Sequence, residues 1–180
     1  MVIERRCYVM TKMVREVIPY IIILVVVLLI RSYVITPVQV VGSSMSYTLS
    51  NNEVLLLNKL DYRFGKISRY DIVVLDTNKN NRKERLIKRV IGLPSEHIAY
   101  RYGKLYVNDE EVDDSFASIT NNFDLKELGY DVIPSGYYFV MGDNRNDSSD
   151  SRVLGLIPIS DIKGSVEIRI WPLNKMGLVK

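Results

Sequence analysis

An uninterrupted apolar stretch at residues 17 to 30, "VIPYIIILVVVLLI", limits the possible folds more than any other feature of the sequence. A helix needs about 20 apolar residues to cross a hydrocarbon core of about 30 Å, and extension to Ile35 supplies that length. Arg31 lies near the end of the extended segment, where a long basic side chain can snorkel to the headgroups. Pro19 lies near its start, where it breaks little of the hydrogen-bond ladder. Residues 17–35 are therefore predicted to form a transmembrane anchor.

A cleavable secretory signal is the alternative interpretation, with "ERRCYVMTKMVRE" as its charged n-region. The sequence that follows, "RSYVITPV", lacks a small-x-small cleavage site, which favours an uncleaved anchor. The positive-inside rule keeps a basic flank in the cytoplasm, and this flank holds Arg5, Arg6, Lys12 and Arg15. We therefore expect a single-pass protein of the cell membrane, with residues 1–16 as a cytoplasmic tail and residues 36–180 as an extracytoplasmic domain.

The composition favours a β-rich domain after the anchor. Twelve tyrosines and many Val and Ile residues fit the pleated surface of strands. The one cysteine, Cys7, excludes a disulfide framework or a cysteine zinc site within the chain. The 24 basic and 21 acidic residues give a net charge of +3, too even a balance to suggest nucleic-acid binding. Neither a metal nor another cofactor is predicted.

The body of the chain divides into short strand candidates separated by turn residues. The candidates are "VQVV", "EVLLLNK", "DIVVLD", "RLIKRVIGL", "HIAY", "KLYVN", "GYYFVMG" and "SVEIRIW". The segment "RYGK" at 101–104 predicts a hairpin, and "FDLKELG" at 123–129 predicts a short helix. The polar run "DTNKNNRKER" at 76–85 is interpreted as a solvated loop. Many irregular strands in one domain favour a mainly β sandwich or partly closed barrel.

Two serines, Ser43 and Ser44, follow a glycine behind an apolar run, and the pattern alone does not distinguish them as nucleophiles. A nucleophilic serine needs a base. The one histidine, His97, follows a turn in "GLPSEHI" and is better explained as a surface loop residue. Lysine can serve as the base when burial lowers its pKa from about 10.4 to about 7–8.

Lys88 is the best candidate for such a lysine. Strand alternation in "RLIKRVIGL" puts it on the same face as Leu86 and Val90, whose apolar side chains disfavour the ammonium form. A snorkelling or edge-strand lysine fits the same period-2 pattern, so that interpretation stays open at this point.

Three motifs in order, together with the stretch between the first two, give the chain a close resemblance to bacterial type I signal peptidases, in their Gram-positive-like single-anchor form. "SMSYTL" from Ser44 resembles the family's S-M-x-P-T-L box, and "KRVIGLPSE" from Lys88 its K-R-x-x-G-L-P-G-D box. "GDNRNDSSDSR" at 142–152 resembles its G-D-N-R-x-x-S-x-D-S-R box, and "NKLDYRFGKISRYDIVV" a further family stretch. The family consists of membrane-anchored Ser-Lys endopeptidases that remove signal peptides from exported proteins.

The resemblance implies a fold and a set of functional residues. The fold is a mainly β catalytic domain of coiled antiparallel sheets, signal peptidase/LexA-like, with a small inserted β-hairpin region at about 97–134. Ser44 becomes the nucleophile and Lys88 the general base, and both act through an acyl-enzyme. Ser148 orients the lysine amine, while three side chains hold the loop around it: Asp143, Asp150 and Arg152.

The substrate implied is a signal peptide with a small-x-small site, bound extended at the membrane surface. From Ile30 to Ser44 the chain extends at most about 3.3–3.6 Å per residue, which keeps the serine within reach of the headgroups. The lipid bilayer and the secretion translocon are further candidate partners. The expected substrate-binding residues, whose apolar members are equally well explained as plain core, are Val38, Val40, Gly42, Met45, Leu49, Leu55, Leu86 and Ile87.

The sequence departs from the family pattern at three places. Tyr47 replaces the proline of the first box, Tyr70 a glycine before Asp71, and Ser95-Glu96 the Gly-Asp after Leu93-Pro94. None of these is a member of the dyad, but they leave efficiency and substrate preference open. The backbone N–H of Ser44 is expected to donate to the oxyanion, whereas Gly42 lacks the hydroxyl that some members carry there.

Two alternative functions are a self-cleaving Ser-Lys regulator of similar catalytic fold and a membrane-anchored β module without activity. The anchor argues against the regulator, which would need a soluble partner domain. The presence of Ser44, Lys88 and Ser148 together argues against an inactive module.

Overall fold

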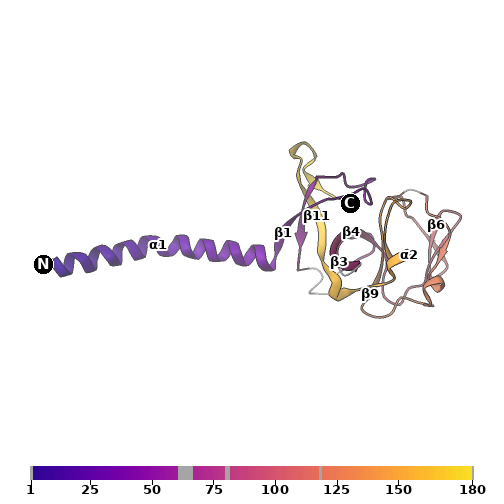
Figure 1. Ribbon diagram of the computed structural model, residues 1–180, viewed down its shortest axis with the longest axis horizontal. Helices are drawn as coiled ribbons and strands as arrows, with labels where there is room; N and C mark the ends of the chain where they lie inside the picture. The colour runs from indigo at the N-terminus through magenta and orange to yellow at the C-terminus, as the bar shows by residue number, and fades with distance from the viewer. Residues whose placement is uncertain (1, 61–66, 80–81, 118, 180) are drawn as a thin grey trace. The chain divides into compact units, whose positions relative to one another are not determined.

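The computed structural model describes residues 2–60, 67–79, 82–117 and 119–179 and divides into two compact units, Met1–Ile35 and Thr36–Lys180. The first unit is formed by helix α1 (Val2–Tyr33), drawn in Figure 1. Its segment Arg15–Tyr33, 19 residues long, is long and apolar enough by length and composition to cross a membrane. The apolar side chains of this segment are exposed, as the lipid-facing side chains of a spanning helix would be.

The second unit is built on a large sheet, here called the main sheet. Its strands, in spatial order, are β1 (Ile35–Gln39), β2 (Val54–Asn58), β11 (Ile162–Trp171), β3 (Ile72–Lys79), β4 (Arg82–Gly92), β9 (Tyr137–Met141) and β10 (Ile157–Pro158), with β12 (Gly177–Leu178) paired to β11. The pairings from β2 to β10 are antiparallel. The expected class, a mainly β chain of antiparallel sheets after an N-terminal apolar helix, is confirmed.

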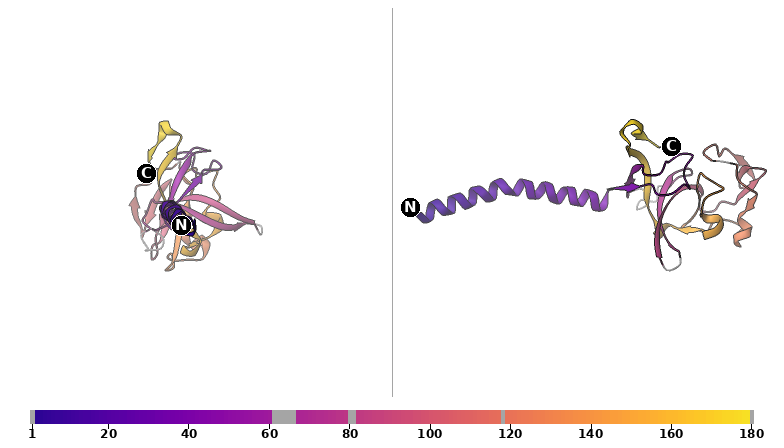
Figure 2. Two further views of the ribbon diagram at one scale, coloured as in Figure 1. Left: turned by 90° about the vertical axis from the view of Figure 1, so that its left-hand side faces the viewer. Right: turned by 45° about the horizontal axis from the view of Figure 1, so that its top comes forward.

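A four-stranded sheet, here called the small sheet, follows β4 in sequence. Its order is β7 (Glu110–Val112), β6 (Lys104–Val107), β5 (Ile98–Arg101) and β8 (Phe123–Asp124). The β5–β6 hairpin turns through Tyr102 and Gly103 with φ of 53° and 81°, so the hairpin predicted at 101–104 is confirmed. The 3-10 helix η1 (Leu125–Leu128) forms the short helix predicted at 123–129. The small sheet lies at one end of the unit, beyond β9 and the short helix α2 (Ser151–Leu154) (Figures 1 and 2).

Apolar clusters cover both faces of the main sheet at its centre and exclude water from it. Alternate residues of β3 belong to different apolar clusters: Ile72 and Val74 pack with β1 and β2, whereas Val73 and Leu75 pack with β9 and β10. A third cluster joins the small sheet to the end of β9. Because burying each large apolar side chain contributes about 1.5–3 kcal/mol, the strand next to β3, which is β4, is firmly held.

The interpretation of residues 76–85 as a loop is wrong. The strands β3 and β4 run on as a two-stranded ribbon in which Asp76 lies opposite Arg85, and Arg85 Nε donates to Asp76 Oδ1 at 2.9 Å. Both views of Figure 2 show this ribbon projecting from the rest of the unit. A projecting ribbon leaves polar side chains in water, so its strands need no apolar alternation, which was the signal used to find strands.

Two of the departures from the family pattern fall on left-handed backbone. Tyr70 has φ of 73° and Ser95 has φ of 70°, both at positions where the family pattern has glycine. Left-handed backbone costs a residue with a Cβ about 1–2 kcal/mol of conformational free energy, whereas it costs glycine little.

Ser95→Gly is therefore expected to raise the free energy of unfolding by about 0.5–1 kcal/mol, after the greater chain entropy of glycine is subtracted. Ser95 is exposed, and its backbone N–H bond to Ile133 O (2.8 Å) survives the change. Tyr70→Gly is the contrast, because it also removes a ring packed 5.0 Å from Phe116 and is expected to destabilise the protein. Urea unfolding measures both, and a less stable Ser95→Gly would contradict the strain argument.

Candidate active site

Ser44 lies in a tight turn between β1 and β2. Ser46 N donates to Ser43 O at 3.0 Å and Leu49 N to Met45 O at 2.7 Å, which closes the turn. The side chains of Met45 and Leu49 are buried in the cluster that covers one face of the main sheet. The turn is thereby fixed to the core, while Ser44 itself stays half-buried.

The structure distinguishes the two serines that the sequence leaves equivalent. Ser43 Oγ donates to Asp147 Oδ2 at 2.5 Å, and Ser43 O accepts from Asn144 Nδ2 at 3.2 Å. Within the described part of the chain, Ser44 Oγ makes no hydrogen bond, and Ser44 lines a groove that Ser43 does not line. Of the two serines, Ser44 is therefore the one that combines an unbonded hydroxyl, within the described residues, with a place in the groove.

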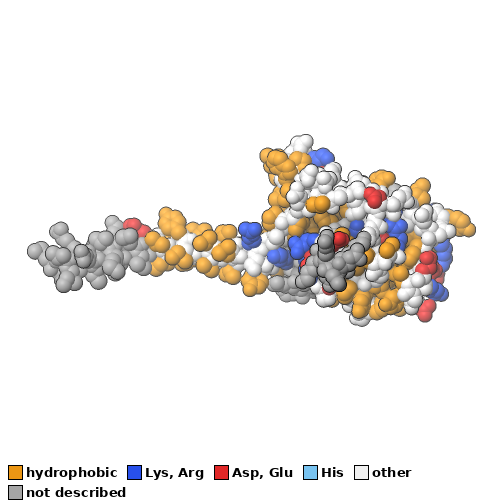
Figure 3. Space-filling view, viewed as in Figure 1, with side chains coloured by type: hydrophobic (Ala, Val, Ile, Leu, Met, Phe, Trp, Pro, Cys, Tyr) orange, Lys and Arg blue, Asp and Glu red, His pale blue; other side chains and the backbone are white. Residues whose placement is uncertain are grey.

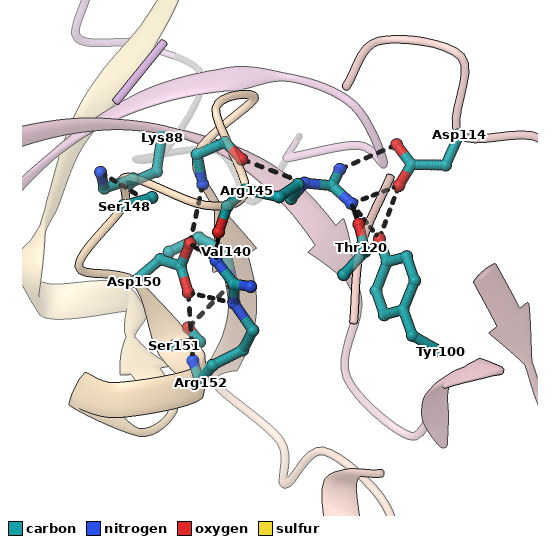
Figure 4. A network of polar contacts seen from close by, with 11 residues as sticks. Lys88, Tyr100, Asp114, Thr120, Val140, Arg145, Ser148, Asp150, Ser151 and Arg152 are labelled. Atoms are coloured by element: carbon teal, nitrogen blue, oxygen red, sulfur yellow. Dashed lines mark hydrogen bonds and ion pairs between the residues drawn. The ribbon is translucent and has the colours of Figure 1, made fainter. Parts of the chain in front are cut away.

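Lys88 lies on β4 with only 1% of its surface exposed. It faces Val73 across the β3–β4 pair, and its strand neighbours Leu86 and Val90 pack in the same cluster as Val73, as the alternation predicts. The Lys88 amine donates to Ser148 Oγ at 3.0 Å (Figure 4). Burial lowers the pKa of Lys88 to about 8, against the opposing charge of Asp150. The predicted direction and cause of this pKa shift are confirmed, and a large fraction of the amine is neutral near pH 8.

Gly142, at the end of β9, brings the first and third motifs together. A Cβ at this position would overlap both the carbonyl oxygen of Ser44 and the hydroxyl of Ser148. The next contact along the loop, from Asn144 N to Ser44 O, is 3.0 Å long. Only glycine allows this close approach, so Gly142 sets the spacing between the Ser44 turn and the Ser148 loop.

Asp143 joins all three motifs through a buried ion pair. It accepts from Arg89 Nε at 2.9 Å and from Arg89 Nη2 at 2.7 Å, and it also accepts from Thr48 Oγ1 at 2.5 Å. Arg89 follows Lys88 in β4, and Thr48 belongs to the turn after Ser44. Because removing one partner of a buried pair costs about 3–5 kcal/mol, this contact holds the strand, turn and loop together.

Asp150 and Arg152 hold the far side of the same loop. Asp150 accepts from Arg152 Nε and Nη2, both at 2.9 Å, and from Gly142 N at 3.1 Å. Burial alone would raise the pKa of Asp150, but its hydrogen bonds with Arg152 keep the pKa below the usual range. Both residues touch the loop rather than the groove, a placement that fits the supporting role implied by the resemblance.

A groove of about 310 Å³ runs beside Ser44. Its lining includes six predicted residues: Val38, Val40, Gly42, Met45, Leu86 and Ile87. Leu49 and Leu55 do not line it, because both side chains are fully buried in the cluster beneath. For these two residues the plain-core interpretation describes the structure.

Five further residues line the groove and were not predicted from the sequence: Pro37, Gln39, Val41, Val74 and Arg85. The groove lies between β1 and β4, which are not neighbours in the main sheet, so the coiling of the sheet brings them together. Val74 could have been found by pairing the two strand candidates that became β3 and β4, because it is the cross-strand partner of Ile87. Nothing in the sequence indicated Arg85.

His97 lies in the loop directly before β5 of the small sheet. Its Nε2 lies 3.0 Å from Asp124 Oδ1, and its backbone N donates to Asn108 Oδ1 at 2.8 Å. These partners account for the ring and the backbone without any contact to the Ser44 turn. The sequence predicts a surface loop residue. In the structure His97 does lie in a loop, but it is half-buried rather than on the open surface.

The chain is similar to known proteins over most of its length. The family model described as signal peptidase, peptidase S26, matches residues 13–171. The chain is 40% identical over 170 residues to a signal peptidase I of Bacillus caldolyticus, covering 88% of this chain and 92% of that protein. It is 34% identical over 166 residues to signal peptidase IB of Staphylococcus aureus, with 84% and 85% covered.

A solved structure supports the same relationship. The crystal structure of a signal peptidase I from Enterococcus faecalis is 32% identical, with a TM-score of 0.50, and the match covers 56% of this chain and 96% of that chain. The chain therefore belongs to the signal peptidase family, peptidase S26, as a bacterial type I signal peptidase and a serine endopeptidase of class EC 3.4.21.89.

Proposed function

We propose that the chain cleaves signal peptides after small-x-small sites with Ser44 as nucleophile and Lys88 as general base. One observation carries the proposal: the buried Lys88 amine, with a pKa of about 8, is held by Ser148 beside the turn that presents Ser44 to the groove. A free lysine, with a pKa of about 10.4, would be almost fully protonated at the same pH.

The reaction begins when the neutral Lys88 amine takes the proton of Ser44 Oγ, which bonds to the carbonyl carbon of the scissile peptide. The Lys88 ammonium then returns that proton to the leaving amine, which gives an acyl-enzyme on Ser44. Lys88 next deprotonates a water molecule that hydrolyses the ester. The amine donates to Ser148 here, and catalytic hydrogen bonds often tighten only when substrate is bound.

The backbone N–H of Ser44 is suited to stabilise the oxyanion, since it has no hydrogen-bond partner within the described residues. The N–H of Gly42 does not serve in the same way, because it donates to Asn51 Oδ1 at 3.0 Å. Gly42 has φ of 96°, so its glycine provides the turn into the Ser44 segment rather than a donor.

The substrate peptide binds extended along β1, which is the first strand of the main sheet and therefore an edge strand. Main-chain hydrogen bonds of an added strand supply affinity, and pockets for alternate side chains supply specificity. A groove of about 310 Å³ shared between several residues of a peptide favours small side chains at the cleavage site.

Cleavage of a precursor with an Ala-x-Ala site by the purified full chain in detergent tests the proposed function. The matched variants are Ser44→Ala and Ser43→Ala, because the two serines are adjacent and only Ser44 lines the groove. Cutting by the wild type and by Ser43→Ala, with none by Ser44→Ala, is the expected result. Equal cutting by Ser44→Ala would remove Ser44 from the mechanism.

Membrane anchoring is proposed through residues 17–35, with residues 1–16 in the cytoplasm and the catalytic unit outside. The support is the exposed apolar face of Arg15–Tyr33 and the basic residues before it. Signal peptides are themselves membrane-associated, so an anchored enzyme meets its substrate at the surface of the bilayer.

A second membrane contact is proposed for the hairpin of β11 and β12, where apolar side chains gather (Figure 3). Its exposed residues are Ile168, Trp171, Leu173, Met176 and Leu178. Trp is favoured at membrane interfaces, and Lys175 adds a charge for anionic headgroups. Arg169 Nη2, within β11, donates to Thr48 O at 3.1 Å, which links this surface to the turn that carries Ser44.

Residues 36–180, produced without the anchor, are therefore expected to sediment with anionic liposomes. Replacing Trp171 and Leu173 together with serine should lower the bound fraction several-fold, because it removes two large exposed apolar side chains from this surface. The control pair is Tyr102, in the β5–β6 turn, and Ile119, in the connection between β7 and β8, both of which are exposed. A truncated domain that stays in the supernatant and cuts precursors at full rate would contradict the membrane contact.

Ser148→Ala is expected to lower kcat by about 10–100-fold, because the base loses the partner that fixes its orientation. The fold should persist, since one hydrogen bond contributes about 1 kcal/mol to stability. Ser149→Ala, at the adjacent half-buried serine, is the control for a change in the same loop. Steady-state rates of both variants check this, and wild-type turnover in Ser148→Ala would remove that residue from the site.

A further inference from the structure

Arg145, in the third motif, is buried between the main sheet and the small sheet. Its guanidinium donates to Tyr100 OH at 2.9 Å, to Thr120 Oγ1 at 2.5 Å and to Asp114 Oδ1 at 2.9 Å (Figure 4). Tyr100 lies on β5, and the other two partners lie between β7 and β8. One side chain of the catalytic loop is thus held by three groups of the small sheet and its connections.

Asp114 closes a ring of contacts with Arg145 and Tyr100. Its Oδ2 lies 2.6 Å from Arg145 Nη1 and accepts from Tyr100 OH at 2.6 Å. Burial raises the pKa of the Tyr100 hydroxyl, which therefore stays a neutral donor. The side chains of Arg145 and Asp114 are only 1% and 8% exposed, so Asp114 neutralises a cation that water cannot solvate.

The same guanidinium reaches the residue that spaces the active site. Arg145 Nε donates to Gly142 O at 3.0 Å, while Asp150 Oδ2 holds Gly142 N at 3.1 Å. Gly142 is therefore fixed on both sides at the point where it contacts Ser44 O and Ser148. A shift of the Arg145 head moves Gly142 O, and with it the gap between the nucleophile turn and the partner of the base.

We propose that Asp114 is a positioning residue of the peptidase, which acts through Arg145 and Gly142 on the placement of Ser148 and Lys88 relative to Ser44. The inference rests on the proposed function, in which Ser44 is the nucleophile and Lys88 the general base. Asp114 contacts neither the groove nor the dyad. The small sheet and its connections therefore act as a brace, meaning that they fix the position of the catalytic loop through Arg145.

A shift in the pH profile without a change in KM would distinguish a positioning role of Asp114 from general destabilisation. Loosening Gly142 lets water reach Lys88, and since desolvation is the main cause of the lowered pKa, the acid limb of the rate profile should move to higher pH. The groove is lined by β1, the turn that carries Ser44, β3 and β4, and Asp114 lies outside this lining, so KM should change little. Charged groups that face Lys88 directly, namely Asp150, Arg152, Asp143 and Asp147, are unaltered by a change at Asp114.

The test compares Asp114→Asn with Asp109→Asn in the full chain, using a fluorogenic Ala-x-Ala peptide in detergent from about pH 6 to about pH 10. Asp109 is the matched control, because it lies in the β6–β7 turn of the small sheet and pairs with Arg101 at 3.1 Å, but its side chain is 73% exposed. We expect kcat of Asp114→Asn at pH 8 to fall about tenfold, with KM within about twofold and the acid limb shifted upward. Asp109→Asn should match the wild type.

Tyr100→Phe provides a second variant if Asp114→Asn does not fold, since it keeps the ring and removes only the bridging hydroxyl. It should show the same shift, smaller in size. A folded Asp114→Asn, or failing that a folded Tyr100→Phe, with the kcat and acid limb of the wild type would overturn the proposal, as would a rise in KM alone. Absence of Lys88-dependent cleavage in the wild type would instead overturn the proposed function, so the two failures are distinguishable.

Discussion

Lys88→Arg is expected to be as inactive as Lys88→Ala, with kcat at least about 10³-fold below the wild type in both. A guanidinium with a pKa above about 12 keeps the positive charge of lysine but cannot accept a proton at working pH. If Lys88 contributed only charge, the arginine variant would retain activity. If it is the base, both variants lose the step in which Ser44 is deprotonated.

Turnover of a precursor by each variant, at equal concentrations of folded protein, measures this effect. Lys104→Arg is the control for the exchange itself, because Lys104 is exposed on the small sheet and pairs with Glu111 at 2.7 Å. It should cut at the wild-type rate. Activity of Lys88→Arg within about tenfold of the wild type would contradict a proton-accepting role.

Lys88→Met is expected to stabilise the folded protein at pH 7 by about 2 kcal/mol while it abolishes activity. The pKa of Lys88 is about 8 in the folded state against 10.5 for an ordinary lysine side chain, so protonating it in the folded state costs about 3 kcal/mol relative to the unfolded chain. The lost hydrogen bond to Ser148 offsets about 1 kcal/mol of the gain. A buried lysine kept for chemistry thus lowers stability.

The pH dependence of this difference identifies its cause. The unfolded chain binds the Lys88 proton more tightly, so wild-type stability rises relative to Lys88→Met as pH increases from about 8 to about 10.5. Above that window the advantage of methionine should disappear. Thermal unfolding of both proteins in detergent at several pH values is the measurement. A less stable Lys88→Met at pH 7, or an advantage independent of pH, would contradict the buried-charge account.

The elements that the sequence predicts well are those whose signals are local. The β5–β6 hairpin follows from Tyr102-Gly103, and the apolar run within α1 from its length and composition. The β3–β4 ribbon was missed beyond Asp76 because its polar strands project into water and carry no alternation. The positive φ of Ser95 could be suspected only from a family pattern that has glycine there.

The candidate site shows the same difference between residues with local sequence signals and residues placed by long-range contacts. Strand alternation made Lys88 a candidate, because its desolvation depends on Leu86 and Val90 in its own strand, but only the family resemblance chose it over a snorkelling lysine. The choice between Ser43 and Ser44 depends on Asp147, more than 100 residues away in the chain. The brace from Asp114 to Arg145 likewise depends on how two sheets meet, which no local pattern encodes.

The pH dependence of kcat/KM for the full chain and for His97→Ala tests the central claim most directly. The claim is that a neutral, buried Lys88 takes the proton of Ser44, so the rate of both proteins should rise with pH through a single acid limb with a midpoint near pH 8. His97 is bound to Asp124 in the small sheet, and its removal should leave that limb unchanged. A midpoint near about 6.5 that is lost in folded His97→Ala would assign the proton to the histidine and contradict the account.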